Sequence, residues 1–330
     1  MGPFLNKLIN TVTLLSFVLL SGCGGGGSSS SETFPIITPP PPPPTNTVPD
    51  CTPTTYTNTL YCTSKRQNLN REFYIYIPDD IDTTNSQVPL LFSLHGYTSR
   101  AIWNLGYTGF QSIAETEKFI VIYPQGTILA STGETHWNVG GWTVGSTTDD
   151  VDYLSSLIDW AYSEYKIDRN RVYSTGMSNG GFMSYHLACN LSYKIAAVAS
   201  VTGSMTPQTY NSCSPTHPTA ILQIHGTADG VVPYYGNSIS RAIPTVMDYW
   251  EEYNDCEQEI INIIDDVNGD GDGGYLYSYN QCLSDVNLRL YLMTNMGHEW
   301  PTNNGQNDII AANEIWYFLK QYDVNGKINF

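Results

Sequence analysis

The chain has 330 residues, of which 41% are hydrophobic and only 14% are charged, and its formal net charge is −17. This length suits one domain with a sizeable core once an export segment and a low-complexity stretch are set aside. The acidity comes from scarce Lys and Arg, and an acidic surface repels phosphate backbones. We therefore expect no nucleic-acid partner.

The first residues predict an export signal. Lys7 supplies a weak positive charge, and residues 8–20 are mostly apolar but too few to span a bilayer comfortably. Residues 20–23 have the sequence Leu-Ser-Gly-Cys, which resembles the lipobox of bacterial lipoproteins. The alternative is an ordinary signal peptide with an incidental cysteine. We expect residues 1–23 to be a lipoprotein signal peptide, Cys23 to be lipidated, and the outer membrane or cell surface to be the destination.

The next segment predicts a tether. Gly and Ser fill residues 24–31, and residues 39–44 are consecutive prolines, which favour a stiff polyproline II rod. We therefore expect residues 24–50 to be a tether and residues 51–330 to form one domain, without an internal repeat.

Apolar runs divide this domain into strands and helices in alternation. We expect strands at residues 73–77, 88–94, 119–123, 171–175, 195–201, 220–225 and 288–292, and helices at residues 149–165, 182–188 and 309–319. Thr147 or Thr148 is expected to cap the first of these helices. The alternation predicts an α/β domain with a mainly parallel central sheet and helices on both faces.

Six cysteines remain beside Cys23, an even number that indicates disulfides in an exported chain. Six cysteines allow 15 pairings. Pairing sequence neighbours closes the shortest loops, and we expect that pattern. The expected bridges are Cys51–Cys62, Cys189–Cys213 and Cys256–Cys282.

The motif most directly linked to chemistry is Gly-Met-Ser-Asn-Gly at residues 176–180. It lies between a predicted strand and a predicted helix, the context of a nucleophile elbow, in which a sharp turn presents the serine above the sheet. Ser178 is therefore the expected nucleophile. The alternative is a glycine-rich turn with an inert serine.

A serine hydroxyl needs a base to remove its proton. In folds with this elbow the acid and the histidine follow the serine in that order. Asp229 and His298 each follow a predicted strand, and the carboxyl ends of such strands are where these folds place their sites. We expect Asp229 to orient His298 and His298 to act as general base. The alternatives are a turn aspartate and a surface histidine.

Acyl transfer also needs donors for the oxyanion. The N–H of Asn179 follows the nucleophile directly, and the second donor is expected from the loop after an early strand. The N–H of Tyr97 fits that place. The loop aromatics Trp137, Trp142 and Trp300 are candidate pocket walls, with local packing as the alternative.

Residues 266–273 resemble the first half of an EF-hand loop. Position 12 of such a loop would be Tyr277, where a bidentate glutamate is expected. A polar hairpin tip is the favoured interpretation, and a structural calcium ion is the alternative. Its candidate ligands are Asp266, Asn268, Asp270 and Asp272.

Together these segments resemble the polyhydroxybutyrate depolymerase / feruloyl esterase family of α/β-hydrolases. The matching segments are residues 94–96, 149–151, 171–173, 176–181, 225–229, 232–234 and 297–301. The resemblance implies the α/β-hydrolase fold, ester substrates in small-molecule, oligomeric or polymeric form, and chemistry that requires no cofactor.

The resemblance does not indicate which ester is hydrolysed. Polyester depolymerases of this kind usually carry a polymer-binding domain after the catalytic domain, and only about thirty residues follow His298. We therefore favour a feruloyl-esterase-like hydrolase of plant-derived aryl or short-chain esters. The alternatives are a polyhydroxybutyrate depolymerase or oligomer hydrolase and, less favoured, a non-catalytic surface lipoprotein that binds a polymer.

Overall fold

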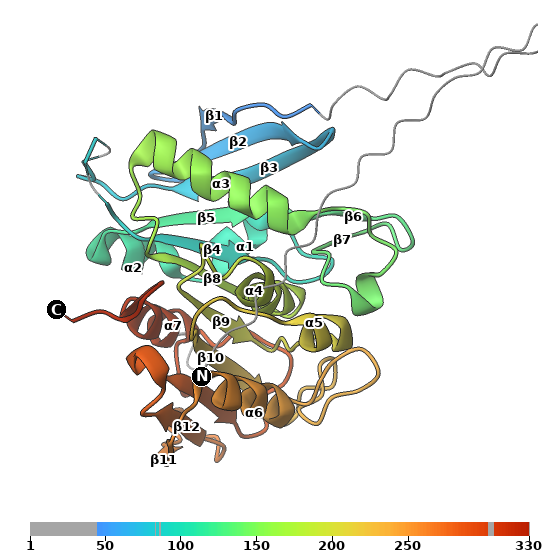
Figure 1. Cartoon of the computed structure of the whole chain (residues 1–330), viewed down its shortest axis with the longest axis vertical. Helices are drawn as coiled ribbons and strands as arrows, with labels where there is room; N and C mark the ends of the chain where they lie inside the picture. Colours follow the sequence, from blue (N-terminus) through green and yellow to red (C-terminus); the bar gives the residue numbers. More distant parts are fainter. Residues whose placement is uncertain (1–44, 83, 86, 303–306, 330) are drawn as a thin grey trace, which may run out of the picture. The chain divides into compact units, whose positions relative to one another are not determined.

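The computed structural model describes residues 45–82, 84–85, 87–302 and 307–329. Within them the main sheet has eleven strands in the order β1-β2-β3-β5-β4-β8-β9-β10-β13-β12-β11 (Figure 1). The strands are β1 (Asp50–Pro53), β2 (Thr59–Arg66), β3 (Leu69–Tyr76), β4 (Leu90–Leu94), β5 (Ile120–Pro124), β8 (Val172–Met177), β9 (Ala197–Val201), β10 (Ala220–Gly226), β11 (Gln258–Ile264), β12 (Gly274–Asn280) and β13 (Leu288–Met293).

The centre of the sheet is parallel and its two edges are antiparallel. Strands β5, β4, β8, β9, β10 and β13 pair in parallel. Strands β1 to β3 add an antiparallel edge beside β5, and β12 and β11 add another beside β13. Every residue of β4, β5, β9 and β10 is buried, which explains their continuous apolar sequences.

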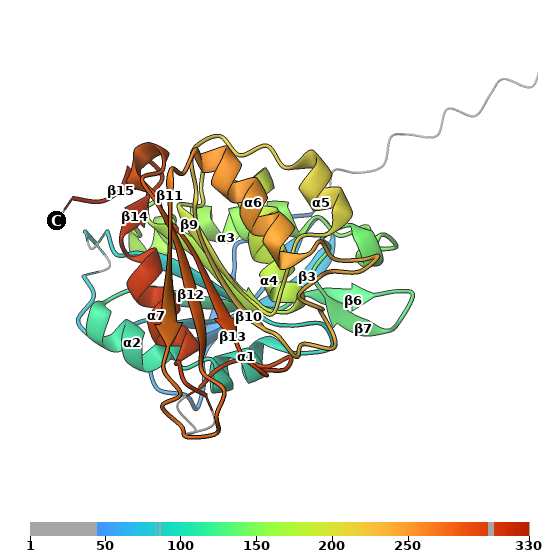
Figure 2. The ribbon, with the colours of Figure 1, turned by 90° about the horizontal axis from the view of Figure 1, so that it is seen from below.

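Helices cover both faces of the sheet (Figure 2). Apolar side chains of α3 (Asp150–Tyr165), α4 (Asn179–Asn190) and α6 (Ile243–Asn254) join one core cluster. Those of α1 (Ala101–Tyr107), α2 (Phe110–Glu117) and α7 (Ala311–Leu319) join the other. The smaller elements are α5 (Pro207–Ser212), the hairpins β6 (Thr127–Leu129)–β7 (Glu134–His136) and β14 (Tyr322–Asp323)–β15 (Gly326–Lys327), and the 3-10 turns Gly141–Thr143 and Leu283–Asp285.

The fold class predicted from the sequence is confirmed, and each predicted strand and helix overlaps an observed one. The predicted cap of α3 is wrong. Asp149 caps this helix, because its Oδ1 accepts the Asp152 N–H at 2.9 Å. Thr148 instead shares a hydrogen bond of 3.0 Å with the hydroxyl of Thr127.

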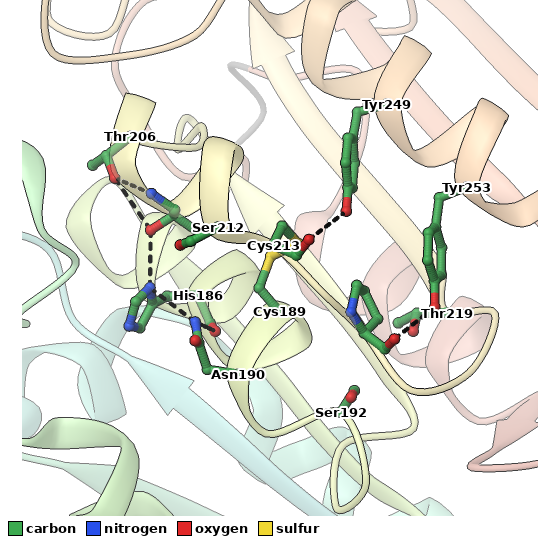
Figure 3. Close-up of a disulfide and its surroundings, with 12 residues drawn as sticks. His186, Cys189, Asn190, Ser192, Thr206, Ser212, Cys213, Thr219, Tyr249 and Tyr253 are labelled. Carbon is green, nitrogen blue, oxygen red and sulfur yellow. Dashed lines mark hydrogen bonds between the residues drawn. A yellow bond between two sulfur atoms is a disulfide. The ribbon is translucent and has the colours of Figure 1, made fainter. Parts of the chain in front are cut away.

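Three disulfides join the expected pairs of cysteines. Cys51–Cys62 links β1 to β2, Cys189–Cys213 links α4 to the end of α5, and Cys256–Cys282 links the segment after α6 to the segment after β12. Around Cys189–Cys213, the Tyr249 hydroxyl on α6 donates to the Cys213 carbonyl at 3.2 Å (Figure 3). This bridge therefore lies where α4, α5 and α6 meet.

The predicted export signal, Cys23 and most of the predicted tether lie outside the described residues. The last part of that tether packs on the domain, since the Thr47 N–H donates to the Lys65 carbonyl at 2.9 Å and the Thr45 N–H to Asn68 Oδ1 at 2.7 Å. The folded part thus begins a few residues before Cys51. No helix in the described part of the chain is both long and apolar enough to cross a membrane.

Candidate active site

Ser178 lies in the sharp turn between β8 and α4. Its φ of 54° and ψ of −120° are rare for a residue with a side chain, and such strain costs about 1–3 kcal/mol. The Ser178 N–H donates to the Val201 carbonyl at 2.8 Å, which fixes the turn against β9. The predicted elbow is therefore present as a strand, a strained serine and a helix.

Glycine is required where this turn meets β4. A Cβ atom on Gly180 would lie only 2.2 Å from the Leu94 carbonyl oxygen, so no larger residue fits without a backbone shift. A Cβ atom on Gly96 would lie 3.5 Å from Cβ of Ser178. The loop after β4 consequently passes directly beside Ser178.

Asp229 follows β10 and is held by three hydrogen bonds. Its Oδ1 accepts the N–H groups of Val231 and Val232 at 2.9 and 2.8 Å, and its Oδ2 accepts His298 Nδ1–H at 2.8 Å. Burial alone would raise the pKa of this carboxyl, but these hydrogen bonds, led by that of His298, hold the pKa below its usual value. Asp229 is therefore an ionised, fixed acceptor at neutral pH.

His298 follows β13, the strand next to β10. Its side chain is 17% exposed, and its Nδ1 is committed to Asp229. No hydrogen bond among the described residues joins its Nε2 to Ser178. Catalytic hydrogen bonds of this kind often tighten only when substrate binds.

The His298 loop and the nucleophile turn are connected through one tyrosine. The Tyr107 hydroxyl donates to Sδ of Met177 at 3.9 Å, and its ring packs edge-on against Trp300 with 6.1 Å between centroids. Met177 precedes Ser178, and Trp300 is two residues after His298. The structure thus places Ser178, Asp229 and His298 after β8, β10 and β13, whose carboxyl ends share one edge of the sheet.

A second histidine lies beside Asp229. His225 Nε2 is 3.7 Å from Asp229 Oδ2 and donates to the Val232 carbonyl at 2.8 Å. Burial lowers its pKa, so the ring is neutral near pH 7. His225 therefore fixes the turn that carries Asp229.

The two predicted oxyanion segments are tied to each other by Trp137. The backbone N–H of Trp137 donates to Asn179 Oδ1 at 2.7 Å, and Asn179 Nδ2 donates back to the Trp137 carbonyl at 3.2 Å. The indole N–H of Trp137 donates to the His95 carbonyl at 2.9 Å. The backbone N–H groups of Tyr97 and Asn179 have no acceptor in the described part of the chain. Both are thus available to an oxyanion.

The aromatic side chains predicted as pocket walls have different roles. Trp137 has no exposed surface, so it supports the oxyanion segments and cannot line a pocket. Trp300 is only 7% exposed and packs against Tyr107 and Phe110. Trp142 is partly exposed and packs edge-on against Tyr97 with 5.0 Å between centroids, which keeps this pair as candidate pocket residues.

The aspartate-rich segment forms the loop between β11 and β12. Asp266 caps this loop, because its two oxygens accept the N–H groups of Gly269 and Gly271 at 2.7 and 2.8 Å. Asp272 Oδ1 accepts Asn295 Nδ2–H at 2.6 Å. No group of three or more His, Cys, Asp or Glu side chains among the residues described is arranged to hold a metal ion. The loop has the geometry of the hairpin tip favoured from the sequence.

The sequence did not indicate Tyr107 or the Asn179 side chain as parts of this site, and it assigned Trp137 to a pocket wall. The contacts of Trp137 with His95 and Asn179 each span 42 residues. They depend on the conformation of the loop that carries the β6–β7 hairpin. No local pattern in the sequence indicates them.

Known proteins that are similar to this chain are esterases. Residues 145–259 match the phospholipase/carboxylesterase family. A bifunctional acetylxylan esterase/xylanase from Neocallimastix patriciarum is 29% identical over 265 residues, covering 80% of this chain and 35% of that protein. Feruloyl esterase D from Neurospora crassa is 24% identical, over 79% of this chain and 85% of that protein. The chain has the α/β-hydrolase fold and is similar to feruloyl and acetylxylan esterases.

Solved structures support the α/β-hydrolase fold. An acetyl xylan esterase from Aspergillus awamori superposes with a TM-score of 0.51 at 16% identity, covering 74% of this chain and 94% of that one. A fluorophosphonate-binding serine hydrolase of Staphylococcus aureus gives a TM-score of 0.52 at 14% identity, over 79% and 98% of the two chains.

The matched relatives differ in length. The chain spans about a third of the acetylxylan esterase/xylanase. It spans 57% of a probable feruloyl esterase C from Aspergillus clavatus, to which it is 30% identical over half of its own length. These matches support a carboxylic ester hydrolase, while the polyhydroxybutyrate depolymerase part of the predicted resemblance stays a prediction.

Proposed function

We propose that the protein is an exported serine hydrolase of carboxylic esters, with Ser178 as nucleophile, His298 as general base and Asp229 as the orienting acid. The observation that carries this proposal is the 2.8 Å hydrogen bond between Asp229 and His298. It lies at the same edge of the sheet as a serine held at a φ of 54°. An ionised aspartate on Nδ1 leaves Nε2 to accept a proton.

In the proposed reaction His298 Nε2 removes the hydroxyl proton as Ser178 Oγ attacks the ester carbonyl carbon. The tetrahedral oxyanion is stabilised by the N–H groups of Tyr97 and Asn179. Collapse breaks the bond to the alcohol, which takes the proton from His298, and leaves an acyl-serine. Water, deprotonated by His298, then attacks the acyl-serine. Collapse of this second intermediate breaks the bond to Ser178 Oγ, which takes the proton back from His298, and the acid is released. No step requires a cofactor.

The proposed substrates are feruloyl-type aryl or short-chain esters of plant origin. The names of the relatives support this choice, since they describe feruloyl and acetylxylan esterases. Hydroxybutyrate oligomers are the second candidate, carried by the segments that resemble polyester depolymerases.

Export is supported by the three disulfides, which persist in oxidising compartments. Anchoring to the outer membrane through Cys23 is part of the proposal and rests on residues 20–23. A calcium ion at Asp266, Asn268, Asp270 and Asp272 is a separate proposal. Thermal unfolding of the protein with calcium and with a chelator tests it.

The function is tested with residues 45–330 on methyl ferulate, p-nitrophenyl acetate, p-nitrophenyl butyrate and 3-hydroxybutyrate oligomers. We expect hydrolysis with preference for the ferulate, and loss of roughly 10⁴-fold or more in kcat for Ser178→Ala. A fluorophosphonate should label the wild type and not the variant. Preference for the oligomers would overturn the substrate choice and keep the mechanism.

The matched control is Ser174→Ala. Ser174 is fully buried within β8, four residues before Ser178, and shares a hydrogen bond of 2.9 Å with the Ser184 hydroxyl. This variant should retain turnover and labelling. Hydrolysis by Ser178→Ala within tenfold of wild type would contradict the assignment of the nucleophile.

A further inference from the structure

The last strand of the main sheet has a row of backbone groups without partners. β11 lies at one end of the strand order and pairs only with β12 (Figure 1). No backbone N–H or carbonyl of β11 bonds to a described residue outside β12. Such an edge is a template on which another strand can pair. The outer edge of β11 is open along seven residues, which span about 24 Å.

The side chains of β11 do not block this edge. Natural proteins commonly protect an exposed edge strand with Lys, Pro or a bulge. β11 contains neither Lys nor Pro, and its seven residues pair with β12 in unbroken register. Ile261 and Ile263 are 53% and 77% exposed. Tyr277 and Tyr275 lie directly opposite them on β12, and Tyr275 is 46% exposed. Neighbouring exposed apolar side chains on an open edge indicate a surface that binds a partner.

The surroundings of β11 are acidic. Residues 242–288, which include α6, β11 and β12, contain eleven of the 31 Asp and Glu residues and no Lys, Arg or His. None of these eleven carboxylates forms an ion pair with a described residue. Several lie close together, since burial raises the pKa of Glu251 on α6 and the charges of Glu259 and Asp248 raise it further. The open edge therefore lies in a negative field.

This field distinguishes between two kinds of partner. If two copies of the chain paired through antiparallel β11 strands centred on Ile261, Glu257 would lie opposite Asp265 at both ends. Like charges directly opposite each other destabilise strand pairing. Glu257 and Asp265 are both exposed, so a strand with Lys or Arg at its ends could instead pair with them. Charge complementarity thus favours a basic strand over a second copy of this chain.

We propose that the outer edge of β11 binds an extended segment of a partner protein, which has apolar side chains at its centre and basic side chains at its ends. The apolar side chains lie beside Ile261 and Ile263. The basic side chains lie beside Glu257 and Asp265. The segment adds a strand to the sheet, so that its backbone supplies affinity and its alternate side chains supply specificity. The surface contains none of the three proposed catalytic residues, and this inference does not depend on the proposed ester hydrolysis.

The test measures binding of labelled synthetic peptides to the purified protein by fluorescence anisotropy. The first peptide alternates Val and Thr and has lysines at both ends. The second has glutamates in place of the lysines, and the third keeps the lysines but has prolines at its centre. We expect a micromolar Kd for the first peptide and a Kd about tenfold or more higher for the other two. Hydrogen exchange of the β11 amides should slow only with the first peptide, because strand pairing protects them.

Charge reversal at both ends of the edge tests the basic partner. Glu257→Lys with Asp265→Lys should weaken binding of the lysine peptide about tenfold and strengthen binding of the glutamate peptide. The matched control is Glu134→Lys with Glu164→Lys, which makes the same change in net charge at two exposed carboxylates on β7 and α3. The control should bind the lysine peptide as wild type does. Melting curves like that of wild type show that both double variants fold.

Absence of binding by the lysine peptide, or equal binding of all three peptides, would overturn the proposal. Equal binding of the lysine and proline peptides would leave an electrostatic contact and exclude the added strand. Equal weakening in the edge variant and the control would show that binding is not located at β11. Self-association of the protein without peptide, lost in Ile261→Lys, would assign the edge to a second copy of the chain instead.

Discussion

Trp137 and Asn179 are paired through their amides. The Trp137 N–H donates to Asn179 Oδ1 at 2.7 Å, and Asn179 Nδ2 donates back to the Trp137 carbonyl at 3.2 Å. The side chain of the residue after Ser178 is thus fixed by a loop 42 residues away. Since the N–H of Asn179 is the proposed oxyanion donor, this pair determines where that donor points.

Asn179→Ala should lower kcat about tenfold or more with little change in KM, because the donor N–H remains but loses its support. The chain offers a matched control. Asn254 makes the same paired contact with the backbone of Thr219, at 2.9 and 2.8 Å, and both asparagines are fully buried. Both variants should lose about 1–3 kcal/mol in free energy of unfolding, but Asn254→Ala should keep the kcat of wild type. Equal kcat values for the two variants would show that the pair is only structural.

Asp229→Asn should lower kcat by roughly 10⁴-fold, because an amide no longer fixes the tautomer of His298. Its kcat is measured beside that of Asp159→Asn, the same change at a half-exposed aspartate of α3 that pairs with Arg169 and Lys194, which should keep kcat. If Asp229→Asn kept kcat within tenfold, another group would have to orient His298.

The same carboxylate makes stability depend on pH. The pKa of Asp229 is lowered in the folded protein, so its contribution is fully present above the unfolded pKa of about 3.9 and is lost as pH falls through the folded value. Wild type should therefore exceed Asp229→Asn in free energy of unfolding near pH 7, and the difference should shrink near pH 2. Urea unfolding at both pH values measures it, and a constant difference would contradict the lowered pKa.

The disulfides should differ in their effect on stability. Cys51–Cys62 closes 11 residues and Cys256–Cys282 closes 26, which in the chain-entropy account correspond to about 2.8 and about 3.5 kcal/mol. Replacing each pair by alanines and measuring unfolding tests this order. An unchanged melting curve after full reduction would show that the bridges do not stabilise the fold.

The sequence predicted the parts of the fold that are buried on both sides. Strands such as β4 and β9 are continuous apolar runs, so their sequences differ clearly from loops. The outer strands β1, β2, β11 and β12 were missed, because few of their residues are buried. All of β11 except Ile264 is exposed although the strand carries four isoleucines. The helix α6 was missed as well, since aromatic and acidic residues interrupt its apolar spacing.

For the candidate site, the sequence placed the residues that belong to motifs and missed those held by long-range contacts. Ser178 could be predicted because two flanking glycines are required by close packing on β4. Trp137 was assigned to a pocket, and the structure shows it fully buried beneath the oxyanion segments. Whether a loop tryptophan faces a pocket or the core depends on the path of its loop, which neither periodicity nor spacing determines.

A buried ion pair supports the loop that carries Trp137. Arg71 on β3 and Asp150 on α3 lie 2.7 Å apart with side chains 1% and 0% exposed. Asp150 Oδ2 also accepts the N–H of Asn138, the residue after Trp137, at 2.8 Å. The pair thus joins an edge strand, a helix and the loop beneath the oxyanion segments.

Arg71→Met should destabilise the fold by about 3–5 kcal/mol, because it leaves the Asp150 carboxylate buried without its partner. The double variant Arg71→Met with Asp150→Asn should recover part of this loss, since the remaining polar group is neutral and its carbonyl still accepts the Asn138 N–H. Urea unfolding of wild type, both single variants and the double variant measures the coupling. Additive losses in the double variant would mean that the two side chains do not stabilise each other, and that the loop is held by its other contacts alone.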